Sequence, residues 1–169
     1  FAWLAGQFDL SRLAVIGHRV VHGGDVFKGP ARITDRVIAQ IDALARLAPL
    51  HQPQSLALIR VMRALYPDVP QTASFDTAFH ATSPPLMRRF AIPRALYDQG
   101  IKRYGFHGLS YRYIAGQLGD LAPDAKVVAA HLGSGASLCA IRGGESIDSS
   151  MGFSTLDGIP MATRSGALD

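Results

Sequence analysis

The apolar residues in the first half of the chain follow two periods, one typical of buried strands and one typical of helices. A mostly apolar run with β-branched residues at 13–21 predicts one strand, and the segment 70–79 predicts another that ends at or just before Asp76. Between them, apolar positions at helical spacing predict one helix from a Thr34 cap to Pro49 and another over 54–66. This half therefore reads as strand, helix, helix, strand.

The second half changes character after a proline-rich stretch. We expect a short helix near 94–99 and a longer one capped by Ser110. Alternating residues at 126–133 and 136–150 then predict three strands, the last two joined by a hairpin turn at Gly143-Gly144. A strand, a glycine loop and a strand hairpin in this order are typical of phosphate binding, within an α/β protein.

Composition narrows the class of protein. A chain of 169 residues with 48% hydrophobic and 18% charged residues indicates a globular protein with one core or parts of two domains. The net charge of +4 comes mostly from arginines, which are scattered, with Arg88-Arg89 as the only adjacent pair. Scattered arginines argue against a nucleic-acid surface and favour anionic small molecules as ligands.

Cysteine use and hydropathy bear on the compartment. The single Cys139 excludes an intramolecular disulfide and a cysteine-based zinc site. No apolar run approaches the ~20 residues of a membrane span, and the first ten residues do not resemble a signal peptide. We therefore expect a cytoplasmic protein without a membrane partner. Both ends are abrupt, which indicates a fragment of a longer chain.

The candidate chemistry lies on loops. All six histidines fall in turn-like or glycine-flanked strings, as do Arg19, Arg164 and Asp76. The HLGSG string at 131–135 lies between two predicted strands, where glycines let backbone amides approach an anion, although a plain β-turn would also explain it. Positive charge on loops around a polyanion is what phosphoryl transfer needs.

Two hydrolytic alternatives fail on spacing. His18 and His22 lie four residues apart, but in a strand that separation is ~13 Å, too far to share one metal ion. The chain also lacks HExxH and the GxSxG string of serine hydrolases.

Taken together, six strings in order resemble the acetate kinase family, within the superfamily of sugar kinases, heat-shock ATPases and actin. They are GHRVVHGG, APLHQPQ, FDTAFH, YGFHGLSYRY, VVAAHLGSGASL and DSSMGFSTLDGIPMATRSG. The resemblance implies a fold of two ribonuclease-H-like domains, of which this internal fragment would hold the end of the first (1–77) and the start of the second (78–169). It also implies reversible phosphoryl transfer from ATP to acetate, giving acetyl phosphate and ADP, with Mg²⁺ and a homodimer for the full-length protein.

The resemblance also implies roles for individual residues. The expected catalytic residues are Asp76, His107 and Arg164. The expected substrate-binding residues are Arg19, Val21, Leu50, Phe106 and Thr155. The expected nucleotide-binding residues are His131, Leu132, Gly133, Ser134 and Gly135, with His51 as an auxiliary.

The chemistry agrees with these roles, with one open point. Two guanidiniums can each hold two oxygens of the meeting anions, and His107 can donate a hydrogen bond to a transferring oxygen. Acetate is already ionised at pH 7, so Asp76 need not be a general base. Orientation of an arginine or of metal-bound water is our preferred role for Asp76, and proton transfer is the role often assigned in the family.

Departures from the family pattern set the alternatives. Thr155 replaces a proline that helps wall the methyl pocket, Asp157 replaces a glutamate, and Ser134 stands where asparagine is common. The alternatives are a propionate or other short-chain acyl kinase, and an inactive fragment, since the adenosine motif and the magnesium glutamate of the family have no counterpart here. We expect no metal ligand in this fragment.

The remaining charged and imidazole groups are expected to be structural. His18, His22 and His80 should make scaffold hydrogen bonds. Arg88, Arg89 and Arg103 should be solvated surface charges.

Overall fold

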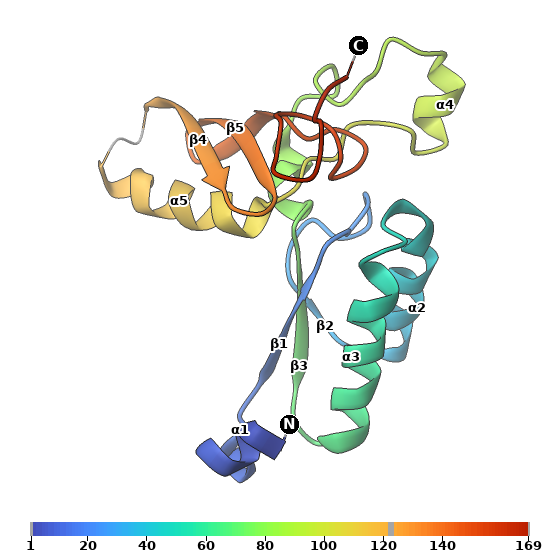
Figure 1. Ribbon diagram of the computed structural model, residues 1–169, viewed down its shortest axis with the longest axis vertical. Coiled ribbons are helices and arrows are strands. Elements are labelled where there is room, and N and C mark those ends of the chain that lie inside the picture. The colour runs from blue at the N-terminus through green and yellow to red at the C-terminus, as the bar shows by residue number, and fades with distance from the viewer. Residues whose placement is uncertain (1, 122–123, 169) are drawn as a thin grey trace.

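The computed structural model describes residues 2–121 and 124–168, which form two separate three-stranded sheets. Figure 1 shows an elongated molecule, with β1, β2 and β3 in the part near the N-terminus and β4 and β5 in the part near the C-terminus. A short helix α1 (Ala2–Gln7) and a 3₁₀ turn (Leu10–Arg12) precede the first strand. The mixed α/β class expected from the sequence is confirmed.

The first sheet has the strand order β1-β3-β2. The central strand β3 (Gln71–Phe75) runs parallel to β1 (Ile16–Val20) and antiparallel to the two-residue strand β2 (Ala31–Arg32). The hydrophobic pattern predicts the two long strands but not β2, which is too short to carry a period. The parallel pairing brings the carboxyl ends of β1 and β3 to one edge.

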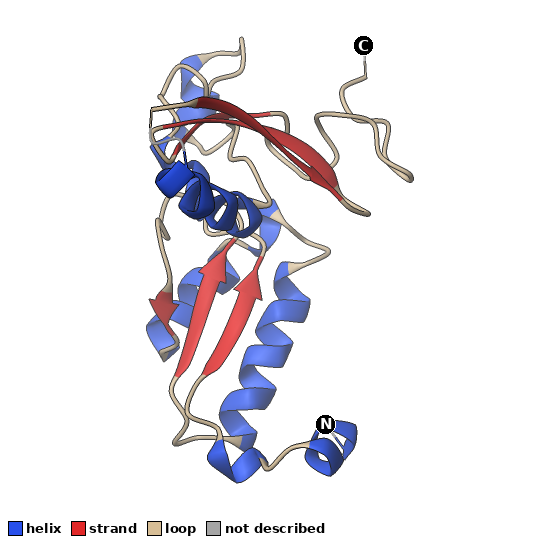
Figure 2. Ribbon diagram, turned by 90° about the vertical axis from the view of Figure 1, so that its left-hand side faces the viewer, coloured by secondary structure: helices blue, strands red, loops and turns tan. Residues whose placement is uncertain are grey.

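Two helices pack on one side of this sheet (Figures 1 and 2). Helix α2 (Asp35–Ala43) begins after Thr34, whose hydroxyl accepts the Val37 amide at 3.2 Å, as the cap prediction requires. The predicted continuation to Pro49 is wrong: a separate 3₁₀ turn (Ala45–Leu47) follows. Helix α3 (Gln52–Leu65) begins two residues earlier than predicted, because Pro53 fits the first turn of a helix. The core between these elements consists of Val20, Phe27, Ile33, Ile41, Leu56, Ile59, Ala73 and Phe75.

The second sheet is an antiparallel meander in the order β4-β5-β6. Its strands are β4 (Lys126–Leu132), β5 (Ala136–Arg142) and β6 (Glu145–Ser149). Gly143 and Gly144, at φ 57° and 77°, form the predicted two-residue turn, which needs positive φ at both positions.

Helix α5 (Gly108–Leu121) packs against this sheet through Tyr111 and Ala115. The predicted Ser110 cap is wrong, because the helix begins two residues earlier. A 3₁₀ helix (Ala78–Thr82) and a short helix α4 (Arg94–Asp98) complete the elements between the sheets.

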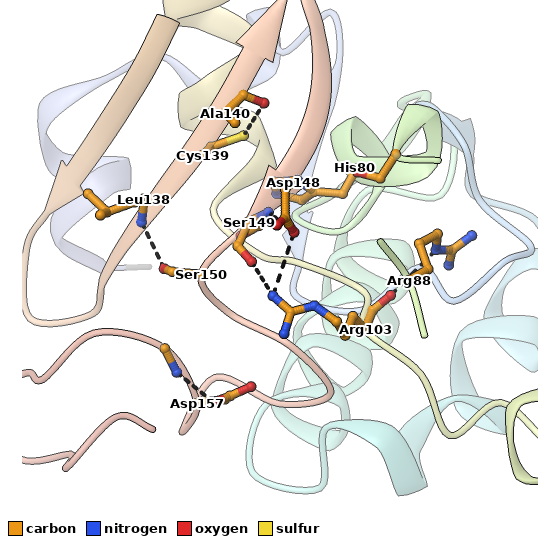
Figure 3. Close-up of polar contacts among 12 residues, drawn as sticks. His80, Arg88, Arg103, Leu138, Cys139, Ala140, Asp148, Ser149, Ser150 and Asp157 are labelled. Carbon is orange, nitrogen blue, oxygen red and sulfur yellow. Dashed lines mark hydrogen bonds and ion pairs between the residues drawn. The ribbon is translucent and has the colours of Figure 1, made fainter. Parts of the chain in front are cut away.

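Arginines expected on the surface instead tie segments together. Arg88 and Lys102 both pair with Asp25, a residue of the loop after β1, and the Arg88 side chain is only 17% exposed. Arg103 donates to the Ser149 carbonyl at 2.5 Å and lies 3.6 Å from Asp148 (Figure 3). The surface prediction is therefore wrong for Arg88 and Arg103, whose charges are satisfied by partners distant in sequence.

The two sheets meet where the chain leaves β3. Figure 2 shows β1 and β3 pointing toward α5 and the second sheet. Ligand sites of open α/β sheets lie beyond the carboxyl ends of such strands. Among residues 2–121 and 124–168, no helix has the length and apolar character to cross a membrane.

Candidate active site

Arg19 and Asp76 form a two-pronged ion pair at the carboxyl ends of β1 and β3. Arg19 donates from Nε to Oδ1 at 3.0 Å and from Nη2 to Oδ2 at 2.6 Å. The Asp76 side chain is 2% exposed, whereas that of Arg19 is 63% exposed. Asp76 raises the pKa of Arg19 by hydrogen bonding and by its charge, against the effect of burial. The carboxylate thus holds a guanidinium whose outer side remains open to a ligand.

The backbone after Asp76 is joined to the start of α5. The Gly108 amide donates to the Asp76 carbonyl at 2.8 Å, and a Cβ at Gly108 would lie 2.2 Å from that oxygen. His107, directly before Gly108, has φ 59°, a left-handed conformation that is uncommon outside glycine. Such conformations persist only where the surroundings impose them, so the position of His107 is set by this close approach.

The His107 ring contacts residues of the second sheet. Its Nδ1 is 2.8 Å from Ser137 Oγ, and the ring stacks on His131 at a centroid separation of 4.1 Å. Burial lowers the pKa of His107 to about 4, and the positive charges of His131, Arg19 and Arg164 act in the same direction against Asp76. His107 is therefore neutral at pH 7 and can donate from one ring nitrogen only.

Arg164 and the glycine turn converge on the same ring. Arg164 donates from Nη1 to the Thr155 carbonyl at 2.8 Å and from Nη2 to the Ser134 carbonyl at 3.0 Å. A Cβ at Gly135 would lie 3.0 Å from His107 Nε2 and 3.1 Å from Arg164 Nη2. His107 Nε2 and Arg164 Nη2 thus both pack against the Gly135 backbone, and a side chain at this position would push them away.

The nucleotide-binding candidates divide within the turn. The Gly133 amide donates to the Gly135 carbonyl at 3.1 Å, so this amide is taken up by the turn itself. His131 Nδ1 lies 3.1 Å from Ser110 Oγ, and Leu132 is 76% exposed. Gly135 is the glycine of this loop that lies against the catalytic candidates.

The remaining substrate candidates are less closely gathered. Phe106 is buried, and its ring centroid lies 5.6 Å from that of His22. Val21, which directly precedes His22, is half-buried. Leu50 is 76% exposed, and His51 is exposed at the start of α3, with no side-chain hydrogen bond to the part of the chain that the structure describes. Thr155 contributes its carbonyl to Arg164.

The expected scaffold histidines make the hydrogen bonds predicted for them. His18 Nε2 lies 2.9 Å from Gln71 Oε1, His22 Nδ1 accepts the Gly24 amide at 3.0 Å, and His80 lies between Ser146 and the Phe106 carbonyl.

Sequence reasoning missed the polar residues behind His107. Ser110, Tyr111 and Ser137 carry hydroxyls that bond to His131, to each other or to His107. The sequence carries no signal for these contacts, because the start of α5 meets the strands of the second sheet only in the folded structure. Within residues 2–121 and 124–168, no three His, Cys, Asp or Glu side chains are close enough to hold a metal ion.

Comparison with known proteins decides the family. The model of the acetokinase family matches residues 5–169. The chain belongs to the acetokinase family. An acetate kinase of Rhodopseudomonas palustris is 53% identical, over 99% of this chain and 43% of that protein. A propionate kinase of Citrobacter rodentium is 48% identical, over 95% of this chain and 41% of that protein.

Solved structures of the family fix the fold. A propionate kinase from Francisella tularensis superposes with a TM-score of 0.94 at 42% identity, over 99% of this chain and 44% of that one. This chain thus has part of the actin-like ATPase fold found in these kinases, as the resemblance implied. It spans less than half the length of the curated relatives that it matches.

Proposed function

We propose that the protein containing this chain is an acetate kinase, which transfers the terminal phosphoryl group of ATP to acetate. The observation that carries the proposal is the convergence of His107 Nε2 and Arg164 Nη2 near Gly135, with the Arg19–Asp76 pair next to them. In the reaction, a carboxylate oxygen bonds to the γ-phosphorus as the bond to the bridging oxygen of ADP breaks. The products are acetyl phosphate and ADP.

The roles follow from charge and position. Arg19 binds the substrate carboxylate or the phosphoryl group during transfer, and Asp76 holds the Arg19 guanidinium in one orientation. Arg164 and His107 stabilise charge on the transferring oxygens, because fixed cations and donors offset the repulsion between two anions. The turn at 131–135 receives the nucleotide phosphates, and a neutral His107 donates without adding charge.

Acyl specificity would depend on the side chains around the methyl group of the substrate. Val21, Leu50, Phe106 and Thr155 would line the methyl pocket, and His51 would assist at its edge. Propionate is the second candidate substrate, since propionate kinases at 48% and 42% identity stand beside the acetate kinases.

The wider features rest on the family. We propose a boundary between domains after residue 77, a homodimer, a cytoplasmic location and Mg²⁺ as the companion of ATP. Mg²⁺ would offset phosphate charge when bound, but the described residues do not by themselves form a metal site. The residue roles given above do not depend on it.

The test is acyl phosphate formation by the full-length protein with MgATP and acetate, propionate or butyrate. We expect the highest kcat/KM with acetate. A higher value with propionate would support the second candidate, and no turnover with any of the three acids would refute the proposal.

A further inference from the structure

Three buried side chains form a chain of hydrogen bonds that ends at His107. Tyr111 Oη lies 2.5 Å from Ser137 Oγ, which lies 2.8 Å from His107 Nδ1. Tyr111 is 1% exposed, Ser137 is fully buried and His107 is 9% exposed. The two outer residues belong to α5 and to the segment just before it, and Ser137 belongs to β5, so helix and sheet meet in this chain.

The protons of these groups can be arranged in three ways. In the first, Tyr111 donates to Ser137, Ser137 donates to Nδ1, and the proton of the neutral ring lies on Nε2. In the second, Nδ1 donates to Ser137 and Ser137 donates to Tyr111, which leaves the buried tyrosine proton without an acceptor among residues 2–121 and 124–168. In the third, Tyr111 and Nδ1 both donate to Ser137, which leaves the buried serine proton without an acceptor among the same residues. A buried donor without a partner is costly, so the first arrangement is favoured.

The orientation matters because Nε2 is the ring nitrogen on the side of Arg164. Nε2 and Arg164 Nη2 lie 3.0 Å and 3.1 Å from the position that a Cβ at Gly135 would take. With its proton on Nε2, the ring adds a second donor to that of the guanidinium. With its proton on Nδ1, it would present a lone pair to an incoming phosphoryl oxygen.

We propose that Ser137 and Tyr111 are positioning residues that keep the proton of His107 on Nε2, aimed at the transferring phosphoryl group. The proposal rests on the proposed phosphoryl transfer for its kinetic consequence, but not for the protonation pattern itself.

The chain offers a matched control in a second buried pair of histidine and serine. His80 Nδ1 lies 2.8 Å from Ser146 Oγ, and both residues are at most 1% exposed. Ser146 lies on β6, beside the strand that carries Ser137. Replacing Ser146 removes a similar buried hydrogen bond from the same sheet at a residue outside the proposed site.

The first experiment measures the protonation pattern directly. The full-length protein is labelled with ¹⁵N-histidine, the His107 ring is assigned by its loss in His107→Asn, and the ring ¹⁵N shifts are read at pH 7.5. We expect Nε2 to carry the proton and Nδ1 to be an acceptor. A spectrum with the proton on Nδ1 overturns the proposal, and this measurement needs neither turnover nor a variant of Ser137.

The second experiment compares kinetics of Ser137→Ala, Tyr111→Phe and Ser146→Ala in the same full-length protein. We expect kcat of Ser137→Ala to fall about tenfold, as for the loss of ~1.4 kcal/mol of orienting hydrogen bond, with KM for ATP within about twofold of the parent. Tyr111→Phe should lose less, and Ser146→Ala should keep the parent kcat.

The outcomes separate the two proposals. Equal kcat in Ser137→Ala and Ser146→Ala, at matched folded fractions by circular dichroism, would overturn the positioning role. Absence of acyl phosphate formation by the parent would instead count against the proposed function, while the ¹⁵N shifts would still decide the protonation of His107.

Discussion

Gly135 should be the least replaceable residue of the glycine turn. Alanine at this position would place Cβ 3.0 Å from His107 Nε2 and 3.1 Å from Arg164 Nη2, inside the 3.4 Å at which ordinary van der Waals contact begins. Both side chains would have to move apart by a few tenths of an ångström.

The expected loss follows from the number of donors affected. Removing one oxyanion-stabilising donor typically costs ~10²–10³ in kcat. Gly135→Ala displaces two donors without deleting either, so we expect a fall of about 10² in kcat/KM for ATP. Stability should change little, because Gly135 lies in a turn outside both cores and its φ is not in the left-handed region.

The matched control is Gly133→Ala in the same turn. A Cβ there would meet the Gly135 carbonyl at 3.4 Å and His131 Nε2 at 3.6 Å, which are ordinary contacts. Initial rates of acyl phosphate formation and thermal unfolding of both variants provide the assay, with the full-length protein as parent. If Gly135→Ala stays within threefold of the parent, then the positions of His107 and Arg164 against Gly135 do not matter for the reaction.

Three further predictions use the same full-length protein. Arg164→Ala should lower kcat by ~10²–10³, and equal rates in this variant and the parent would contradict the proposed role of Arg164. Arg164→Lys should recover only part of the lost kcat, because lysine lacks the fork that reaches two backbone carbonyls. Asp76→Asn should release Arg19 from its ion pair and raise KM for acetate about tenfold, as for the loss of a hydrogen bond to a charged group. An unchanged KM in steady-state kinetics would show that Asp76 does not orient Arg19. Burial lowers the pKa of His22 and His80 to about 4, so the unfolded chain binds more protons below pH 6.5 and stability should fall as the pH drops from about 6.5 to about 4. At pH 5 the loss is about 2 kcal/mol for each histidine, and His80→Asn should flatten the dependence of the urea midpoint on pH; parallel curves for parent and variant would contradict it.

The sequence predicts best where local chemistry alone decides the structure. Thr34 caps its helix because a threonine followed by helical apolar spacing leaves few alternatives. Gly143-Gly144 makes its turn because few other residues accept positive φ at both positions. Ser110 misled because a serine near a helix start usually caps it, whereas here its hydroxyl bonds to His131 across the fold.

For the candidate site, the sequence identified residues but not the contacts between them. The resemblance singled out Arg19, Asp76, His107 and Arg164, and the structure brings all four into one electrostatic environment. The spacing of residues in the sequence could not have shown that Arg19 donates hydrogen bonds to Asp76, because 57 residues separate them. Nor could it have shown that Arg88 pairs with Asp25, since that contact exists only after the two halves of the chain have packed.

The active site depends on contacts that no single sheet can supply. Arg19 and Asp76 stand at the end of the first sheet, whereas His131 lies on β4 of the second sheet and Gly135 lies in the turn between β4 and β5. The hydrogen bond from Gly108 to the Asp76 carbonyl joins them through backbone atoms, and the 2.2 Å approach of a Cβ to that oxygen leaves no space for a side chain. Because the same junction holds His107 at φ 59°, a small shift between the sheets would move the His107 ring relative to Arg19. Catalytic groups lose much of their effect when displaced by about 1 Å, so if the proposed roles hold, we expect substitutions that loosen this junction to lower kcat.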